Sequence, residues 1–425
     1  MQKNHLRPFM GRVGLSVLAL ASLGLASGAR AEPMQLATAL TRAAELNPEL
    51  EAVRPRLKAV EGAVAQAGVR PNPTLGLETE NVLGSNTYGG IDGAETTLRY
   101  SQVYETSDKR RARQDLAASQ RDLILAEARV KGLDLMHEVE AVWIAAVAAE
   151  ADVEVARERL AMAERSLREV SRRVAAARDP LFAGALTEAN VAKARISLDQ
   201  AGDRARVAKA QLAAYWIGST DIDLDLTSFK SPALPSFVSE DMPDAELLRA
   251  RERQASARIR VETTRPLRDK TLTAGVRHFN ADGSVAFVVG GSIPLARHDT
   301  NQGAIAQARA EADAAALDIR AYDVKRARDL VAIKARLGGY LNEVKRLDAE
   351  VVPQAERAIR LVEEGFARGG FAYRDLMNAH EALLSVKAER ITLLKTFHLE
   401  RAHYERLSGQ WIALLPAPDV NTEAK

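Results

Sequence analysis

Two long stretches of the chain carry apolar residues at alternating spacings of three and four, the pattern of helices that pack side by side. The first lies within residues 108–178, which contain no proline. Its seam consists of apolar residues and one glycine: Leu125, Ala128, Gly132, Leu135, Val139, Val142, Ala146, Ala149, Val153, Ala156, Leu160, Ala163, Leu167, Val170 and Val174. As one helix this stretch would be roughly 105 Å long, far more than a globular core needs.

A shorter seam occupies the second half of the chain, with Leu330, Ile333, Leu337, Tyr340, Val344, Leu347 and Val351. Pro353 follows it and predicts a kink. Each long run turns back near glycines: Gly184 after Asp179-Pro180 in the first half, and Gly365, Gly369 and Gly370 in the second. Such residues break a helix and favour a hairpin. The returning helices are predicted at 186–218 and 372–409, with Thr187 accepting an amide hydrogen bond as a cap.

A different period marks two pairs of strands. Residues 284–293 place Val285, Phe287 and Val289 on one face and mostly small residues on the other, and 271–279 precede them across a tight turn. In the first half, the predicted strands are 74–83 and 95–104. Strands of about ten residues with one apolar face match membrane-spanning β-strands. Four strands cannot close around a lumen, whereas three chains would supply twelve.

The order of strand pair and long helical hairpin occurs twice, which predicts two tandem structural repeats. We expect the repeats at 32–218 and 246–415, joined by a connector at 219–245 and followed by a tail at 416–425. The connector contains several prolines and would, with the tail, form a belt around the middle of the helical body.

Residues 1–31 have the features of a secretory signal peptide: basic residues, then the apolar stretch 14–26, then the small-residue cleavage site Ala29-Arg30-Ala31. The apolar stretch is too short to span a membrane as a helix. The charged residues of this segment are all basic, so the formal charge of +2 comes from the signal and does not point to nucleic acid.

The chain contains no cysteine, which excludes disulfides, thiolate metal sites and a lipid on an N-terminal cysteine. It has no G-x-S-x-G, phosphate-cradling glycine loop or H-E-x-x-H motif, so we expect neither an enzyme nor a cofactor. The histidines of the mature chain are interpreted as surface or interface residues with no metal site: His137, His278, His298, His380, His398 and His403. The last two are five apart, which does not place two ligands on one helical face.

Several short motifs, taken in order, suggest a family. They are Asn47-Pro48, Arg70-Pro71-Asn72-Pro73, the stretch 104–113, Ile293-Pro294-Leu295 followed by Asn301-Gln302-Gly303, the segment 365–379 and Leu407-Ser408-Gly409. Over about residues 35–415 the chain resembles the outer-membrane factors of tripartite efflux pumps, the TolC family. It looks most like the branch that serves heavy-metal resistance pumps for nickel, cobalt, cadmium and zinc.

This resemblance implies an α+β membrane protein that forms a homotrimer. Its twelve-stranded barrel, four strands per chain, would lie in the outer membrane of a Gram-negative bacterium, in contact with lipid. A long α-helical barrel would continue into the periplasm. The partners would be a periplasmic adaptor (membrane fusion protein) and an inner-membrane, proton-driven RND transporter. The protein itself would be a passive duct for divalent metal cations.

The resemblance also suggests a gate. In the family, the second hairpin carries two aspartates three residues apart that face the channel, and the matching positions here are Asp375 and Asn378. Three-fold symmetry would turn Asp375 into a ring that favours cations, while Asn378 halves the expected charge. Arg368 and Arg374 could pair with Asp375 or with neighbouring helices, or all of these could be solvated charges. The hairpin-end glycines Gly184, Gly365, Gly369 and Gly370 are expected where the adaptor binds.

Other interpretations remain open at this point. The same duct could carry drugs, other organic compounds, copper or silver, because a duct accepts whatever its pump delivers. A periplasmic adaptor or a structural coiled-coil protein would also contain long helices, although an adaptor has one hairpin of this kind. Two copies of the hairpin, each with a strand pair of membrane length, argue against both.

Overall fold

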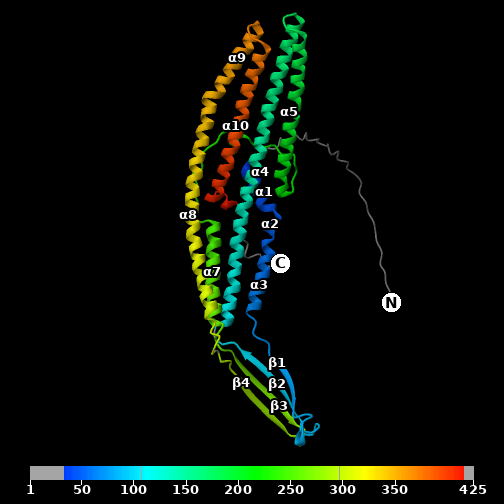
Figure 1. Ribbon diagram of the computed structural model, residues 1–425, viewed down its shortest axis with the longest axis vertical. Coiled ribbons are helices and arrows are strands. Elements are labelled where there is room, and N and C mark those ends of the chain that lie inside the picture. The colour runs from blue at the N-terminus through cyan, green and yellow to red at the C-terminus, as the bar shows by residue number, and fades with distance from the viewer. Residues whose placement is uncertain (1–32, 107, 296, 416–425) are drawn as a thin grey trace, which may run out of the picture.

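The computed structural model describes residues 33–106, 108–295 and 297–415 and shows a long rod of helices with a four-stranded sheet at one end (Figure 1). The predicted signal peptide and tail lie outside the described residues. The chain enters along the rod through α1 (Leu36–Leu46), α2 (Pro48–Glu51) and α3 (Val53–Ala67). Both α1 and α3 pack against the longest helix, α4.

Helix α4 spans Lys109–Ala175 and is 67 residues long, roughly 100 Å. Its predicted seam is confirmed: Val139, Ala146 and Val170 are completely buried. α5 (Leu181–Ala213), α7 (Pro243–Thr264) and α10 (Tyr373–Ser408) all pack on α4. The many alanines on these contacts let the helix axes approach closely. Within the part of the chain that the structure describes, no helix is both long enough and apolar enough to cross a membrane.

The second half contains α8 (Gln302–Arg346), the π turn η3 (Leu347–Val351) and α9 (Val352–Arg368), which continue one another along the rod (Figure 1). The irregularity predicted at Pro353 therefore begins earlier, at Leu347. Proline has no amide hydrogen, and its ring crowds the carbonyl four residues before it. A π turn in the preceding residues accommodates that clash without ending the helix.

The sheet consists of β1 (Thr74–Glu80), β2 (Glu95–Tyr104), β3 (Lys270–Phe279) and β4 (Val285–Ser292). Its order is β1-β2-β3-β4 with every neighbouring pair antiparallel, so the two strand pairs join side by side. β1 ends at Glu80, before the predicted residue 83, because Asn81 and Leu83 have positive φ angles of 60° and 57°. The short 3₁₀ turn η1 (Asn86–Tyr88) follows in the β1–β2 loop.

The two faces of the sheet differ in polarity. The register sets Leu98, Val276 and Phe287 across from one another, and it does the same for Tyr100, Ala274 and Val289. This apolar face is open in the protomer, where Phe287 is 86% and Val289 84% exposed. The opposite face carries Glu78, Glu80, Glu95, Arg99 and Arg277 together with threonines and small residues.

The return of the first hairpin differs from the prediction. α5 begins at Leu181, directly after Pro180, and ends in the 3₁₀ turn η2 (Ala214–Trp216). The predicted cap at Thr187 is wrong, because this residue lies inside α5 and is completely buried. Its hydroxyl donates a hydrogen bond to the carbonyl of Ala183 at 2.6 Å instead of accepting one from an amide.

The connector crosses the middle of the rod and contains the short helix α6 (Thr227–Lys230). Phe229 of α6 is completely buried in the main core cluster, which includes residues of α1, α4 and α10. Further along, the amide of Ser239 donates to the carbonyl of Ser408, at the end of α10, at 2.8 Å. The last described element is the 3₁₀ turn η4 (Ile412–Leu414). Ile412 packs against the cluster that contains Met242 and Ala245, at the end of the connector and the start of α7.

Candidate gate and hairpin ends

The two helical hairpins end together, at the end of the rod that is farthest from the sheet (Figure 1). One turn joins α4 to α5 and contains Ala177 at φ 56°. The other joins α9 to α10 and contains Gly369 at φ 85°. All of the gate and tip residues suggested by the resemblance lie in or near these two turns.

Two of the predicted tip glycines are required by the geometry of the second turn. Gly369 caps α9 in the left-handed region, and its amide donates to the carbonyl of Phe366 at 3.0 Å. A Cβ atom on Gly365 would lie 2.2 Å from the ring of Phe371. Gly184, in contrast, lies in the first turn of α5 with open space around it, so packing does not require a glycine there.

Arg173 on α4 connects the two hairpins. Its Nε and Nη2 donate to the carboxylate of Asp179 at 2.7 and 3.0 Å, and Nη1 donates to the carbonyl of Phe366 on α9. The guanidinium carbon lies 4.5 Å from the centre of the Phe366 ring, which adds a cation–π contact. The hydrogen bonds to Asp179 raise the pKa of Arg173. Sequence reasoning missed this residue, because in the sequence it is one arginine among many on a charged helix.

A small apolar cluster lies beneath these polar contacts. Val170, Ala183, Phe366 and Leu376 are buried against one another, so all four helices of the two hairpins contribute. The amide nitrogen of Asn190 on α5 also donates to the hydroxyl of Tyr373 on α10 at 2.9 Å. The two hairpin ends are therefore one packed unit within the protomer.

The gate candidates occupy different environments. Asp375 is half-buried, and its carboxylate accepts a hydrogen bond from the amide of Ala372 at 3.1 Å, which caps the first turn of α10. Asn378 and Arg374 are exposed. Arg368 pairs with Glu364 one turn away on α9, rather than with Asp375.

The interpretation of the histidines as surface or interface residues is wrong for His380 and His398, which are buried in the protomer itself at 3% and 5% exposure. His398 stacks on Phe229 of the connector, and its Nε2 donates to the Phe229 carbonyl at 2.9 Å. Burial lowers its pKa to about 4. His380 lies 3.3 Å from the carboxylate of Glu363, and burial lowers its pKa as well. α6 and α9 cover these side chains, a contact that helix periodicity cannot reveal.

Metal-ligating residues do not gather in the described part of the chain. Among those residues, no group of three or more histidine, aspartate or glutamate side chains is arranged to hold an ion. His137 and His403 approach each other edge to face, with ring centres 5.9 Å apart.

A buried pair of carboxyl groups lies in the middle of the rod. Glu140 on α4 and Glu405 on α10 are only 2% and 4% exposed. Trp411 Nε1 donates to Glu140 at 3.1 Å, and Arg401 Nε donates to Glu405 Oε1 at 2.7 Å. Burial, followed by the charge of Glu405 and a hydrogen bond to it, raises the pKa of Glu140 well above its ordinary value. Glu140 therefore keeps its proton where an exposed glutamate would lose it.

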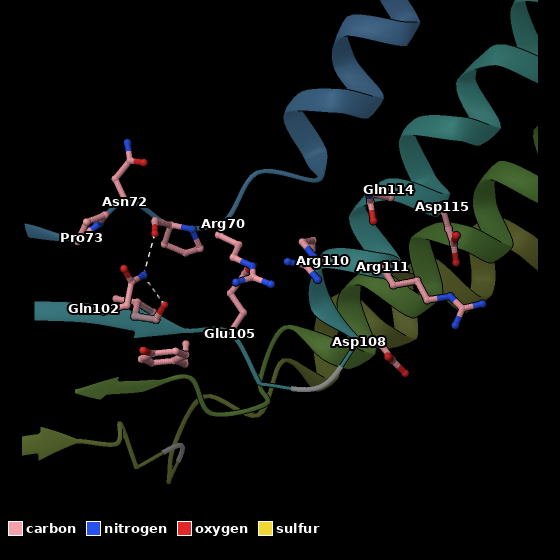
Figure 2. Close-up of a pocket in the computed structure, with 13 residues that line it drawn as sticks. Arg70, Asn72, Pro73, Gln102, Glu105, Asp108, Arg110, Arg111, Gln114 and Asp115 are labelled. Atoms are coloured by element: carbon pink, nitrogen blue, oxygen red, sulfur yellow. Dashed lines mark hydrogen bonds between the residues drawn. The ribbon is translucent and has the colours of Figure 1, made fainter.

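A groove of about 990 Å³ lies where the sheet meets the helices. Figure 2 shows Arg70 and Gln102 on one side of it and Arg110 and Arg111, from the start of α4, on the other. The side-chain amide of Gln102 donates to the carbonyl of Pro71 at 3.0 Å, which fixes the entry to β1 against the end of β2. Two of the motifs on which the resemblance rests, 70–73 and 104–113, thus meet at this junction.

Comparison with known proteins agrees with this architecture. No family model matches the chain. The cobalt-zinc-cadmium resistance protein CzcC of Cupriavidus metallidurans is 26% identical over 389 residues, which cover 89% of this chain and 91% of CzcC. The nickel-cobalt-cadmium resistance protein NccC of Alcaligenes xylosoxydans xylosoxydans is 26% identical over 72% of this chain and 70% of its own length.

Among solved structures, the outer-membrane channel OprN superposes with a TM-score of 0.69 at 16% identity, over 89% of this chain and 90% of OprN. The superposition covers nearly the whole of each chain. The fold class predicted from the sequence is confirmed by this match. The chain therefore has the fold of a solved outer-membrane channel, and the metal-resistance proteins CzcC and NccC are similar to it in sequence over most of its length.

Proposed function

We propose that this chain forms the outer-membrane duct of a tripartite efflux pump that exports divalent metal cations and so confers metal resistance. The observation that carries the proposal is its similarity to CzcC over nine tenths of both chains, on a structure with the fold of an outer-membrane channel. The names of the relatives point to cobalt, zinc, cadmium and nickel as the cargo. The duct itself would carry out no chemistry.

The sheet supports the part of this proposal that concerns the membrane. Its apolar face is uncovered in the protomer, whereas its other face is polar. β1 and β4 are the edges of the sheet and leave backbone groups for pairing with another chain. Pairing β1 of one copy with β4 of the next would close a twelve-stranded barrel in a homotrimer, with the apolar faces toward lipid.

The helices would then form the periplasmic part of the duct, and the hairpin ends would meet the adaptor of an inner-membrane RND transporter. The division into repeats at 32–218 and 246–415 with a connector at 219–245 belongs to this proposal. Each repeat would contribute one strand pair and one hairpin. A trimer would therefore place six quasi-equivalent repeats around the pore.

We place the gate at the α9–α10 turn, with Asp375 as a ring of three carboxylates. Asp375→Ala would remove that charge and a helix cap worth about 1 kcal/mol, so we expect a higher leak conductance and weaker cation preference. Single-channel recording in a lipid bilayer measures both. Glu188→Ala, which removes an exposed carboxylate from α5 of the other hairpin, serves as the control, and unchanged conductance and selectivity in D375A would refute this placement.

The experiment that tests the function compares metal tolerance and accumulation in a host carrying the cognate pump, with and without this chain. The panel contains nickel, cobalt, zinc, cadmium, copper and silver, and several organic drugs. Sensitivity confined to divalent metals supports the proposal and names the cargo. Sensitivity to drugs alone would keep the duct and reject the metal assignment, and no change with any compound would reject both.

A further inference from the structure

The polar face of the sheet carries a network centred on Arg277 of β3. Its Nη1 donates to Glu95 at 2.6 Å, and its Nη2 donates to Glu80 at 2.8 Å. The third donor, Nε, binds the hydroxyl of Thr97 at 2.9 Å. One guanidinium therefore ties together β1, β2 and β3, close to the loop end of the sheet.

The strand register explains why a cation is needed at this point. Glu80 of β1 and Glu95 of β2 are direct cross-strand partners, so their carboxylates point to the same side of neighbouring strands. Like charges in that position destabilise a sheet. Thr97 is the direct partner of Arg277 on the other side of β2, which places the guanidinium beside both carboxylates. The side-chain amide of Asn81 supports the arrangement by donating to Glu95 at 3.1 Å.

Without the arginine, these groups would form a different kind of site. Two carboxylates and a hydroxyl on adjacent strands are the hard oxygen donors that bind divalent cations. A duct for divalent cations cannot keep such a site on its wall, because conduction requires that each bound ion leaves easily. A fixed positive charge between the carboxylates has two effects. It removes the repulsion between them, and it occupies the space in which a cation would bind.

We propose that Arg277 occupies the place that a divalent cation would otherwise take between Glu80 and Glu95, and so prevents the outer end of the duct from retaining its cargo. The geometry of the network stands by itself, while its role in transport rests on the proposed function. Arg277 is thus a specificity-determining residue of the channel wall.

Arg99 provides a matched comparison on the same face of the sheet. Within the described residues its one ion pair is with Glu78, at 3.4 Å, and both side chains are more exposed than that of Arg277. Since Glu78 pairs across the strands with Thr97 rather than with another acid, removal of Arg99 leaves no facing carboxylate pair. Arg99→Gln therefore removes the same charge from the same face without creating the cation site.

The first test measures cation retention by the full-length protein in detergent after equilibration with zinc, cobalt or calcium and dialysis. We expect Arg277→Gln to retain about one divalent cation per chain, and wild type and R99Q to retain none at this site. Replacing Glu80 and Glu95 by glutamine in the R277Q background should abolish retention. If R277Q retains no more metal than R99Q, the proposal is wrong.

Because the carboxylates of R277Q repel each other, this variant is also assembled with and without millimolar zinc or calcium. The proposal expects the cation to restore the heat-resistant assembled form of R277Q and to leave wild type and R99Q unchanged. If R277Q is unstable and neither zinc nor calcium restores its assembled form, the proposal is wrong.

Bilayer recordings separate this inference from the function on which it rests. Wild type should conduct, and R277Q should be blocked by zinc at about tenfold lower concentration because its carboxylates are uncompensated. A wild-type protein that forms no pore would refute the proposed function. A conducting R277Q with wild-type sensitivity to zinc would refute the role of Arg277 alone.

Discussion

Glu140 and Glu405 show how strongly a single side chain depends on partners distant in the sequence. Among the described residues, Glu405 Oε2 is buried and has no hydrogen-bond partner. Burial, followed by the charge of Glu405 and a hydrogen bond to it, raises the pKa of Glu140, so a proton held by Glu140 can serve as the donor between the two carboxyl groups. Two buried carboxylates sharing one proton are stable, whereas two unprotonated ones would repel each other in a low-dielectric environment.

This arrangement fixes the sign of a pH effect. The folded-state pKa of Glu140 is raised above the ordinary value of 4.5, so the stability of the protonated pair is fully present below pH 4.5 and is lost as the pH rises through the folded-state pKa. The loss is about 1.4 kcal/mol for each pH unit in that interval. Glu140→Gln keeps a donor at all pH values, so we expect a higher Tm than wild type at pH 8 and little difference at pH 4.5.

Thermal unfolding of the detergent-solubilised protein across this pH range measures the effect. Glu138→Gln is the control, because Glu138 lies on the same helix and is exposed. The quantity to compare is the Tm of wild type minus the Tm of E140Q. If this difference increased from pH 5 to pH 8, the assignment of the proton to Glu140 would be wrong.

At the scale of elements, the two hairpins depend on Arg173 for their connection. Arg173→Ala removes the contacts to Asp179 and to the Phe366 carbonyl and leaves these partly buried acceptors without their donor, at a local cost of about 1 kcal/mol. We expect the α4–α5 turn to open more often, so that chymotrypsin cleaves faster near Phe182. In bilayers the closed state should be less stable and the open probability higher.

The neighbouring residue provides the control for that experiment. Among the described residues, Arg172 forms its ion pair with Glu169 on its own helix, and its side chain is 77% exposed. Arg172→Ala should leave both the cleavage rate and the open probability near wild type, because exposed ion pairs contribute little. Equal behaviour of R172A and R173A would show that Arg173 does not hold the hairpins together.

For the whole molecule, the orientation of the sheet can be tested by two adjacent valines on β4. Val289 lies on the open apolar face and Val288 on the polar face. If the apolar face contacts lipid, Val289→Lys should destabilise the inserted trimer by about 2–4 kcal/mol, while Val288→Lys is tolerated because it points into the lumen. The fraction of heat-resistant trimer recovered from membranes measures this difference. Equal losses in both variants would argue against the proposed barrel.

The sequence by itself determined the parts of this protein that follow from local periodicity. The seam on α4 repeats regularly over many turns, so its burial was predictable, and the alternation along β4 assigned its apolar face in advance. Likewise Gly369, directly after α9, predicted the turn, because its φ of 85° is one that residues with a Cβ atom rarely adopt. In each case the signal and the structure it specifies lie within a few residues of each other.

Only the tertiary structure decided which distant residues meet. His398 is buried because α6 of the connector covers it, Arg173 matters because α9 brings the Phe366 carbonyl within reach, and Arg277 meets Glu80 and Glu95 because β3 pairs with β2. Each of these contacts joins segments separated by more than 160 residues. Helix and strand periods specify which face of an element is buried, but the partner on that face is set by packing and register.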